Sequence, residues 1–491
     1  MLELLTPKQM ALADKATIDG GIAGIQLMEN AGEAVVEILN LEVPDAGKIL
    51  VICGTGNNGG DGFVAARLLY EQQKKVTVLI AGDVANIAGD AKLAFERLDR
   101  KIVSNEKPDL SKYDAVVDAL FGAGLDRPVI GEPALLIDAV NASGKPVVSV
   151  DLPSGIDGSS GQVMGCAINA NATVTFFRYK PGHLLVPGRY HCGNHHLRQI
   201  GITEKTLTQS RYAACRNQQN LWLNTYPATR PDGHKYDRGH CLVVSGPVAS
   251  TGAARLVAGA ALRTGSGLVT IASPSDALIV NASHLTSIML RCADKPEEIQ
   301  EVLSDERFNC IAMGPGMLPD NHTVRMVEAV LEMKRNTVLD AGALSAFRSR
   351  PSELFQAIRR SGGQVVLTPH EGEFRTLFPD EKDIRSKLEK AKSASEKSGS
   401  VILLKGPDTV VASGRNEASI SNNAPPWLAT AGSGDVLTGI VAGLLAQGMP
   451  VFDAANAAVW MHGAAAKSVG PGMISSDLDA GLQNVIRGLV A

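Results

Sequence analysis

The sequence lacks the cysteine pattern of an oxidised or zinc-binding protein. Its seven cysteines are scattered, odd in number and without a CxxC pair: Cys53, Cys166, Cys192, Cys215, Cys241, Cys292 and Cys310. Neither a disulfide framework nor a zinc site is indicated. The N-terminal stretch also has no long apolar core and carries Glu3, Asp14 and Asp19, unlike a signal peptide. We therefore expect a cytoplasmic protein.

Basic excess, aromatic residues and long apolar runs are also scarce. The chain has 47 Lys and Arg against 51 Asp and Glu, a formal charge of −4, and 4% aromatic residues. Without a surplus of positive charge, nothing would drive nucleic-acid binding. No apolar run approaches the length of a membrane span. We expect neither nucleic acid nor a membrane as a partner.

Glycine, in contrast, is abundant, and the chain is long. Its 491 residues include 50 glycines and alternate between apolar and turn-rich segments, which favours two large α/β domains. From about 204 to 220 the sequence becomes polar and loses its periodicity, as an interdomain connection would. We place the domains at residues 1–212 and 222–491, with a linker at 213–221.

The most informative stretch, ATAGSGDVLTGIVAGLLAQG, covers residues 429–448. Gly432 and Gly434 allow a tight turn, and the apolar residues that follow have the 3.6-residue spacing of an amphipathic helix. The N–H groups at such a helix start form an anion site, with Asp435 at its mouth. This geometry suits phosphoryl transfer with Asp435 as the base. The alternative is an ordinary helix with Asp435 as an N-terminal carboxylate.

A βαβ unit begins at Lys48, with a strand, a glycine turn, a helix and a second strand from Val76. Gly54, Gly56 and Gly59 satisfy GxGxxG and Asp83 follows the next strand, so a dinucleotide-binding redox domain is one interpretation. However, Asn57, Asn58 and Asp61 crowd the turn, and Asp61 would repel a pyrophosphate. Clustered oxygens better suit a hard monovalent cation or a hydroxylated ligand.

Two later segments place polar residues at strand ends. Asp118 precedes the turn 122–128, and Asp151 ends an apolar strand with Ser154 behind it. Such residues converge at the carboxyl edge of a parallel sheet. The alternative for each carboxylate is a helix cap or a turn residue.

These blocks carry a resemblance over roughly residues 1–210. NNGGDG (57–62), VDALFGAGLDRP (117–128), DLPSG (151–155), LMENAG and FFRYKPGH resemble the YjeF N-terminal domain, the NAD(P)H-hydrate epimerase family. The resemblance implies a Rossmann-like αβα sandwich, with Asp151 against the reacting ring and Asn58, Asp118 and Ser154 binding K+. The other residues implied to hold the hydrate are Asn57, Asn58, Gly59, Gly60, Asp61, Gly122, Ala123, Gly124, Leu125, Asp126, Arg127 and Pro128. Asp151 could serve as both acid and base in inverting the C6 centre.

Three histidines near the end of this half, His191, His195 and His196, raise the possibility of a metal site. No acidic or thiol cluster accompanies them at ligand spacing. We therefore favour surface or edge-strand histidines and assign no metal there.

In the second half, strands that begin near residues 241, 310, 337, 364 and 401 each end in glycine or polar residues and precede a helical segment. This order is typical of a doubly wound parallel sheet with its site at the strand carboxyl ends. The helix expected after the first strand is rich in small residues, which would permit close packing on a sheet or on a neighbouring subunit.

GAARLVAGAALRTGSGLV, MGPGM, LTPHEGE, LLKGPDTVVA and TAGSGDVLTGIVAGLLAQG together resemble the ribokinase-like superfamily and, within it, the NAD(P)H-hydrate dehydratase family. The resemblance implies that Ala253, Gly316, His370 and Asp435 contact the hydrate. It also implies an adenine-nucleotide site formed by Lys405, Gly406, Pro407, Asp408, Thr409 and Gly434. His370 could instead be a loop residue satisfied by backbone, and Lys405 a strand-end charge.

Two departures from the dehydratase pattern concern side contacts of the site. Gly342 stands where the family often has aspartate, and Pro425, Pro426 and Trp427 make a bulkier approach to the glycine loop. Mg2+ would normally escort the nucleotide phosphates, although no Asp-rich motif is visible.

Together the two halves indicate a repair enzyme that epimerises the R and S hydrates of NADH and NADPH and dehydrates the S form. The resemblance favours ADP over ATP as the donor and a homo-oligomer, a tetramer or larger. One rival is a kinase of a small alcohol, since such glycine loops occur across the superfamily. Another is a non-catalytic binding module in the first half.

Overall fold

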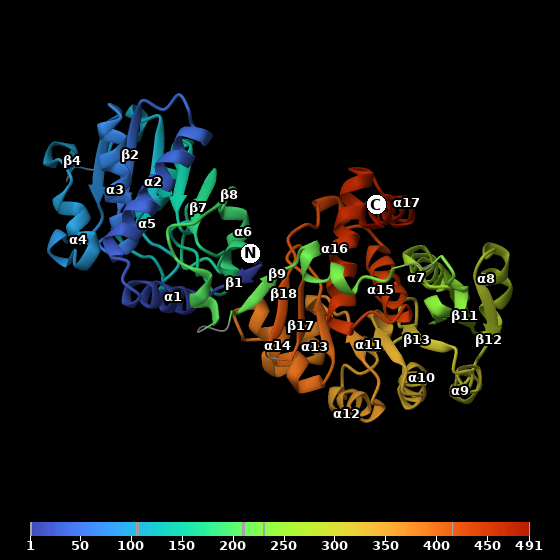
Figure 1. The fold of residues 1–491 in the computed structure, drawn as a ribbon. Coiled ribbons are helices and arrows are strands. Elements are labelled where there is room, and N and C mark those ends of the chain that lie inside the picture. The colour runs from blue at the N-terminus through green and yellow to red at the C-terminus, as the bar shows by residue number, and fades with distance from the viewer. Residues whose placement is uncertain are drawn as a thin grey trace. The chain divides into compact units, whose positions relative to one another are not determined.

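The computed structural model describes residues 2–104, 106, 108–208, 212–228, 231–414 and 416–490. The chain divides into two compact units, residues 3–214 and 215–491 (Figure 1). Part of the expected polar connection, residues 209–211, lies outside the described residues. No helix among the described residues is long and apolar enough to cross a membrane.

The first unit is built on a parallel sheet. Its strands lie in the order β4 (Val103–Ser104), β3 (Lys75–Ile80), β2 (Lys48–Cys53), β5 (Ala115–Ala119), β6 (Val147–Val150), β7 (Ala172–Phe176) and β8 (Asn194–Arg198). The strand order reverses between β2 and β5, the place where open α/β sheets bind ligands. The predicted βαβ unit and the convergence of Asp118 and Asp151 at one sheet edge are confirmed.

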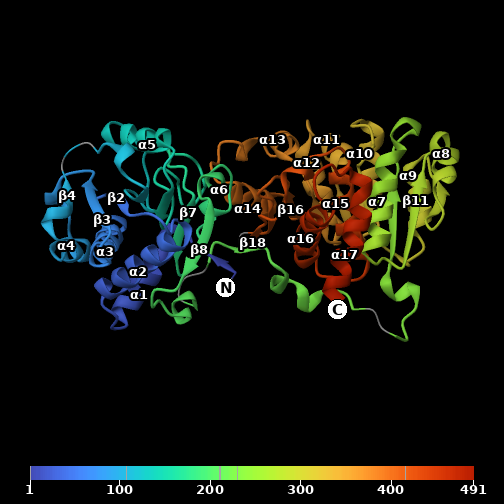
Figure 2. The ribbon, with the colours of Figure 1, turned by 90° about the horizontal axis from the view of Figure 1, so that it is seen from above.

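Helices cover both faces of this sheet. Figure 2 shows α2 (Gly24–Glu42), α3 (Asn57–Glu71) and α4 (Gly89–Glu96) on one face and α5 (Glu132–Ser143) on the other. A Cβ added to Gly32 would lie 2.4 Å from a methyl of Val64, so glycine allows α2 to pack closely on α3. Two further helices are α1 (Pro7–Asp19), which starts with a Thr6 capping box, and the short α6 (Gly188–His191).

The second unit contains a larger, mixed sheet. Its strands lie in the order β9 (Ala214–Arg216), β18 (Glu417–Ile420), β17 (Val410–Ser413), β16 (Val401–Leu404), β15 (Val365–Leu367), β14 (Asn336–Leu339), β13 (Phe308–Met313), β10 (His240–Val244), β11 (Leu268–Ser273) and β12 (Met289–Cys292). All pairs from β16 to β12 are parallel, and β17 runs antiparallel to its neighbours. The predicted doubly wound sheet is confirmed, with its strand-order reversal between β10 and β13.

Two helical layers enclose this sheet. On one side lie α7 (Thr251–Thr264), α15 (Ser433–Ala446), α16 (Val451–Val469) and α17 (Leu478–Val490), and Figure 1 shows α9 (Pro296–Leu303), α10 (Asn321–Glu332) and α12 (Pro351–Ser361) on the other. The remaining helices are α8 (Leu278–His284), α11 (Ala341–Ser345), α13 (Glu371–Leu377) and α14 (Lys387–Ser398). The predicted helix after the glycine loop is α15. The small residues of α7 pack against it, because a Cβ on Gly439 would lie 2.3 Å from Val257 O.

The expected linker at 213–221 has regular structure. It contains β9 and a 3-10 turn (Gln219–Leu221), and β9 pairs with β18. The buried Asn217 amide donates hydrogen bonds to Ser421 Oγ and Asn456 O, both at 2.8 Å. These contacts explain why a polar, aperiodic stretch is ordered.

Candidate functional site

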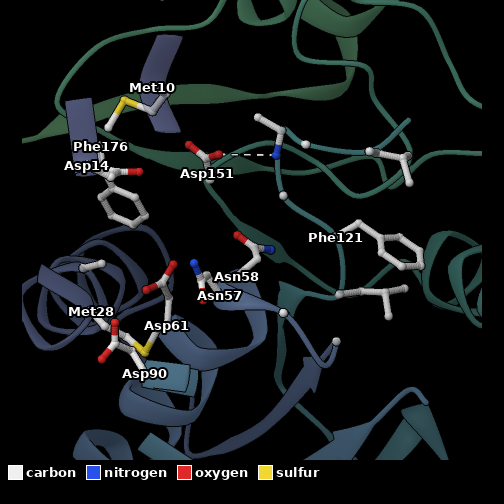
Figure 3. Close-up of a pocket in the computed structure, with 18 of the residues that line it drawn as sticks. Met10, Asp14, Met28, Asn57, Asn58, Asp61, Asp90, Phe121, Asp151 and Phe176 are labelled. Carbon is white, nitrogen blue, oxygen red and sulfur yellow. Dashed lines mark hydrogen bonds between the residues drawn. The ribbon is translucent and has the colours of Figure 1, made fainter. Parts of the chain in front are cut away.

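A cavity of about 550 Å³ opens at the strand-order reversal of the first unit (Figure 3). The turns after β2 and β5 form much of its wall, and α1, α2 and the end of β6 contribute further residues. Most predicted hydrate-binding residues line it: Asn57, Asn58, Asp61, Gly122, Ala123, Gly124, Leu125, Asp126, Arg127 and Asp151. Gly59, Gly60 and Pro128 are not among the lining residues.

The glycines of the first turn serve close packing. A Cβ on Gly54 would lie 2.1 Å from Leu120 O, and one on Gly59 would lie 1.9 Å from Gly54 O. Only glycine therefore fits where the turns after β2 and β5 meet. This packing starts α3 at Asn57 and carries Asn57, Asn58 and Asp61 on its first turns.

Asp151 is the most constrained carboxylate of the cavity. Its Oδ1 accepts hydrogen bonds from Lys180 Nζ at 2.5 Å and from Thr175 Oγ1 at 3.0 Å, and its Oδ2 accepts from Ala123 N at 3.3 Å. Burial by itself raises the pKa of Asp151, but the Lys180 ammonium outweighs it and holds that pKa below the usual value. Asp151 is therefore ionised.

The backbone of Asp151 is held in the left-handed region, with φ of +63°. His183 supports this conformation: its Nδ1 accepts from Lys180 N at 3.0 Å, so its Nε2 donates to Asp151 O at 2.7 Å. Burial and the nearby Lys180 lower the pKa of His183 to about 4, so the ring is neutral. A non-glycine residue at positive φ is costly and is often found at functional sites.

The three predicted potassium ligands lie on adjacent segments. Asp118 is buried at the end of β5, where Ser154 Oγ donates to its Oδ1 at 2.6 Å. Burial raises the pKa of Asp118, against the hydrogen bonds from Ser154 and Ser149. Asn58 faces the neighbouring turn, since a Cβ on Gly122 would lie 3.1 Å from Asn58 Oδ1. The Nδ2 atom of Asn58 is buried without a hydrogen-bond partner.

Among the other acidic groups that line the cavity are Asp61 from α3 and Asp14 from α1. Burial and the charge of Asp151 raise the pKa of Asp61 well above its usual value, and burial raises that of Asp14 to about 6. Sequence reasoning assigned no role to Asp14. Its place in the amphipathic pattern of α1 gives no sign that it faces a cavity.

The three histidines near the end of the first unit lie on two elements, α6 and β8. His195 and His196 lie on β8, an end strand of the sheet, as predicted. His196 Nε2 lies 2.7 Å from Glu42 Oε1, and His191 Nδ1 lies 3.1 Å from Ile168 O. Among the described residues, no group of three or more His, Cys, Asp or Glu side chains could hold a metal ion.

In the second unit, three charged side chains meet at the N-terminus of α15. Asp435 lies in the first turn of α15, Asp340 follows β14 and Lys405 follows β16. Lys405 Nζ donates to Asp340 Oδ1 at 2.7 Å, and Thr438 Oγ1 donates to Asp340 Oδ2 at 2.8 Å. Burial and the Asp340 charge raise the pKa of Asp435 to about 6, against the effect of Lys405. The sequence alone did not indicate Asp340, because its partners Lys405 and Thr438 lie 65 and 98 residues away along the chain.

The glycines of this loop have distinct roles. Gly432 precedes α15 at φ +81°, a conformation that favours glycine. Gly434 lies next to Lys405, since a Cβ added to Gly434 would be 3.6 Å from Lys405 Nζ. The N-terminus of α15 therefore lies close to an ammonium group, which is an arrangement suited to phosphate.

Two predicted hydrate contacts are neighbours. A Cβ on Gly316 would lie 3.2 Å from the Cβ of Ala253, and Ser250 Oγ donates to Gly316 O at 2.6 Å. This places the start of α7 against the turn after β13. His370 instead caps α13, where its Nδ1 accepts from Gly372 N at 2.9 Å and Glu373 N at 3.2 Å, with a largely exposed ring.

The predicted nucleotide loop 405–409 is internally bonded. Thr409 Oγ1 donates to Gly406 O at 2.8 Å, and buried Asp408 pairs with Lys387 at 2.6 Å.

Both departures from the family pattern have structural explanations. A Cβ on Gly342 would lie 2.1 Å from Met317 O, and Trp427 Nε1 donates to Ala466 O at 2.9 Å.

Comparison with known proteins finds two family models and full-length relatives. Residues 24–182 match the YjeF-related protein N-terminus, and residues 241–477 match NAD(P)H-hydrate dehydratase. The bifunctional NAD(P)H-hydrate repair enzyme Nnr of Coxiella burnetii is 33% identical over 97% of this chain and 98% of its own length. The enzyme of the same name from Escherichia coli is 32% identical over 95% of this chain and 90% of its own.

A solved structure also resembles the second unit. It is that of the ADP/ATP-dependent NAD(P)H-hydrate dehydratase from Bacillus subtilis co-crystallised with ATP and Mg2+. The two chains are 26% identical with a TM-score of 0.49, over 56% of this chain and 98% of that one.

Proposed function

The chain belongs to the family of bifunctional NAD(P)H-hydrate repair enzymes, and from this premise we propose how its two sites divide the work. The first half is an NAD(P)H-hydrate epimerase and the second an ADP/ATP-dependent NAD(P)H-hydrate dehydratase. The observation that carries this conclusion is the 33% identity along 97% of the chain. We assign the first activity to the cavity around Asp151 and the second to the N-terminus of α15.

In the epimerase cavity, the turns after β2 and β5 bind the hydrated nucleotide and Asp151 faces the reacting ring. The supporting contacts are those of Lys180, Thr175 and Ala123, which fix the Asp151 carboxylate in one orientation. A carboxylate held this way can exchange a proton with the C6 hydroxyl. Of the predicted contacts that do not line the cavity, Gly59 packs against Gly54, and Gly60 packs against Met28 and Ala91.

Potassium would be held by Asn58, Asp118 and Ser154. The residues fit such an ion because they supply amide, carboxylate and hydroxyl oxygens, and because the Oδ1 atom of Asn58 faces the turn at Gly122. Bound there, K+ would steady the two turns electrostatically. Ser154, which follows β6, already bonds to β5 and the turn after it, since its Oγ accepts from Phe121 N at 2.8 Å and donates to Asp118.

In the dehydratase site, Asp435 accepts the proton of the C6 hydroxyl, whose oxygen forms a bond to the terminal phosphorus of the nucleotide. The bridging P–O bond then breaks. The ring nitrogen lone pair expels phosphate, and loss of a C5 proton restores the dihydropyridine. Phosphorylation is needed because hydroxide is a poor leaving group, and the N–H groups at the start of α15 steady the transferred phosphoryl.

The nucleotide contacts Lys405, the loop 406–409 and Gly434, and the hydrate contacts Ala253, Gly316, His370 and Asp435. These assignments are supported by the proximity of Lys405 to Gly434 and of Ala253 to Gly316. Mg2+ would be held largely by the nucleotide phosphates and water. ADP as the preferred donor and a homo-oligomer, a tetramer or larger, remain predictions, as do domain bounds at 1–212 and 222–491.

One assay tests the whole proposal. A mixture of both hydrate epimers is supplied with ADP or ATP, with and without K+, and the absorbance of reduced nicotinamide is followed. We expect both epimers to be consumed, with release of free phosphate. A stable phosphate ester would indicate a kinase instead. If Asp151→Ala leaves consumption of the R epimer unchanged, the first half is a binding module.

A further inference from the structure

The carboxyl groups of the first cavity differ in how they are held. Asp151 accepts three hydrogen bonds, whereas Asp61 and Asp14 accept none from the described residues. Asp61 nevertheless sits on a rigid base, since the first turn of α3 packs on glycines that leave no room for a Cβ. Figure 3 shows Asp61 and Asp151 reaching into the space from different sides, with Asn57 and Asn58 between them. Asp61 is therefore fixed in position but free to bond a ligand.

Burial and the charges around the cavity push the pKa values of the two carboxyl groups in opposite directions. Burial and the negative charges of Asp151 and Asp14 keep the pKa of Asp61 high, and Lys180 opposes them only in part. The other charged groups on the wall are Asp90, Asp126 and Arg127. Neighbouring carboxyl groups whose pKa values are pushed apart are typical of acid–base pairs.

We propose, on the basis of the epimerase function above, that Asp61 is a second catalytic residue, which works with Asp151 on opposite faces of the C6 centre. The two groups form a carboxyl pair in which one member is the proton donor and the other the acceptor. Two placed groups explain inversion more directly than one, because a single carboxylate would have to reach both faces of the same carbon.

The reaction balances with water as the only small molecule. Asp61 gives its proton to the C6 hydroxyl, the C6–O bond breaks, water leaves, and the ring nitrogen lone pair forms a C=N bond. A water molecule then adds to the other face, its electron pair forms the new C6–O bond, and the C=N pair returns to nitrogen. Asp151 takes the proton released by that water. At the end Asp61 is ionised and Asp151 is protonated, which is the state that the reverse reaction requires.

The test uses the full-length chain and separated hydrate epimers. Asp61→Asn keeps the shape of the side chain but cannot donate a proton in the same way. We expect it to lower kcat for interconversion on the order of 100-fold or more in both directions, with little change in KM. Dehydration of the S epimer by the second half should be unchanged. Asp61→Glu, which keeps the acid, should recover part of the rate.

Three further measurements make the outcome decisive. Asp19→Asn, an exposed change on α1, is the matched control and should retain the wild-type rate. Asp14→Asn identifies the alternative acid: loss of rate there but not in Asp61→Asn overturns the proposal. In ¹⁸O-labelled water, each wild-type inversion beyond the enzyme-free background should place one label at C6. Inversion without label would also refute it.

Failure of this inference and failure of the proposed function give different results. If the wild-type chain does not interconvert the epimers, the epimerase assignment is wrong. If the wild type is active and Asp61→Asn keeps more than about a tenth of its rate, only the role of Asp61 is wrong. If Asp61→Asn no longer binds the hydrate in a titration, Asp61 is a binding residue and the two-carboxyl pair is overturned.

Discussion

Lys405 Nζ lies 2.7 Å from Asp340 Oδ1, so the lysine at the predicted nucleotide site is already paired in the structure. Asp340 is 1% exposed and also accepts from Thr438 on α15 and from Ala341 N. It therefore links the end of β14, the end of β16 and the helix that carries Asp435. We infer that Asp340 is a positioning residue that holds Lys405 near Gly434.

Burial of Asp435 and the Asp340 charge should together set the pH dependence of dehydration. Asp435 must be ionised to accept a proton, and burial together with Asp340 raises its pKa to about 6. The rate should therefore increase as pH rises through about 6 and level off above it. In Asp340→Asn the negative charge is lost, the pKa of Asp435 falls, and the rising limb moves to lower pH. A pH profile of kcat for the S hydrate measures this shift.

The matched control is Thr438→Val, which removes a hydrogen bond to Asp340 without changing charge. We expect Thr438→Val to lower the plateau rate, while the rising part of the pH profile stays near pH 6. If the rising part of the pH profile stays at the same pH in Asp340→Asn, burial alone sets the pKa of Asp435.

In the first unit, Lys180→Met should change both epimerisation and stability. Without the ammonium group, burial raises the pKa of Asp151 above its usual value, so less of it is ionised at neutral pH. We expect slower epimerisation that recovers partly as pH rises. Breaking a buried ion pair costs about 3 kcal/mol, measurable by urea unfolding. The double variant Lys180→Met, Asp151→Asn should be more stable than Lys180→Met. If the double variant is no more stable than Lys180→Met, the ion pair between Lys180 and Asp151 contributes little to stability.

Much of the fold and part of each site could be predicted from local sequence. The strand ends at Asp118 and Asp151 were visible because an apolar run stops at a carboxylate, and parallel strands bring such ends to one edge. The α15 loop was visible because two glycines precede a helical pattern. These signals extend over a few residues, so no tertiary information is needed to read them.

The other features could not be predicted from the sequence, because they depend on contacts between segments that lie far apart along the chain. Asp14 looks like any polar residue of an amphipathic helix, and only packing turns it toward the cavity. Asp340 lies two residues before Gly342, which drew attention as a departure, yet its partners come from β16 and α15. The order within 213–221 likewise depends on Asn217 reaching Ser421 and Asn456.

Gly432 should be essential for dehydration but not for epimerisation. It adopts φ +81°, and a Cβ there would lie 2.8 Å from both Leu256 Cδ1 and Ser475 Oγ. Gly432→Ala therefore strains the loop, costs about 1 kcal/mol and displaces the N–H groups that face phosphate. We expect a large loss of dehydratase rate with normal epimerisation, measured on the same sample. Gly448→Ala also has positive φ but open space around it, and should retain dehydratase activity.

His370 caps α13 in the structure and is also proposed to contact the hydrate, and two substitutions can separate these roles. Its Nδ1 caps α13, while its Nε2 lies on a ring that is 60% exposed and near Glu373. Asparagine is a good N-cap, so His370→Asn should preserve stability, whereas His370→Ala should lose about 1 kcal/mol. If the ring also contacts the hydrate, both variants should raise KM for dehydration. A normal KM in His370→Asn would mean that the histidine only caps the helix, and the proposed hydrate contacts would then be reduced to Ala253, Gly316 and Asp435.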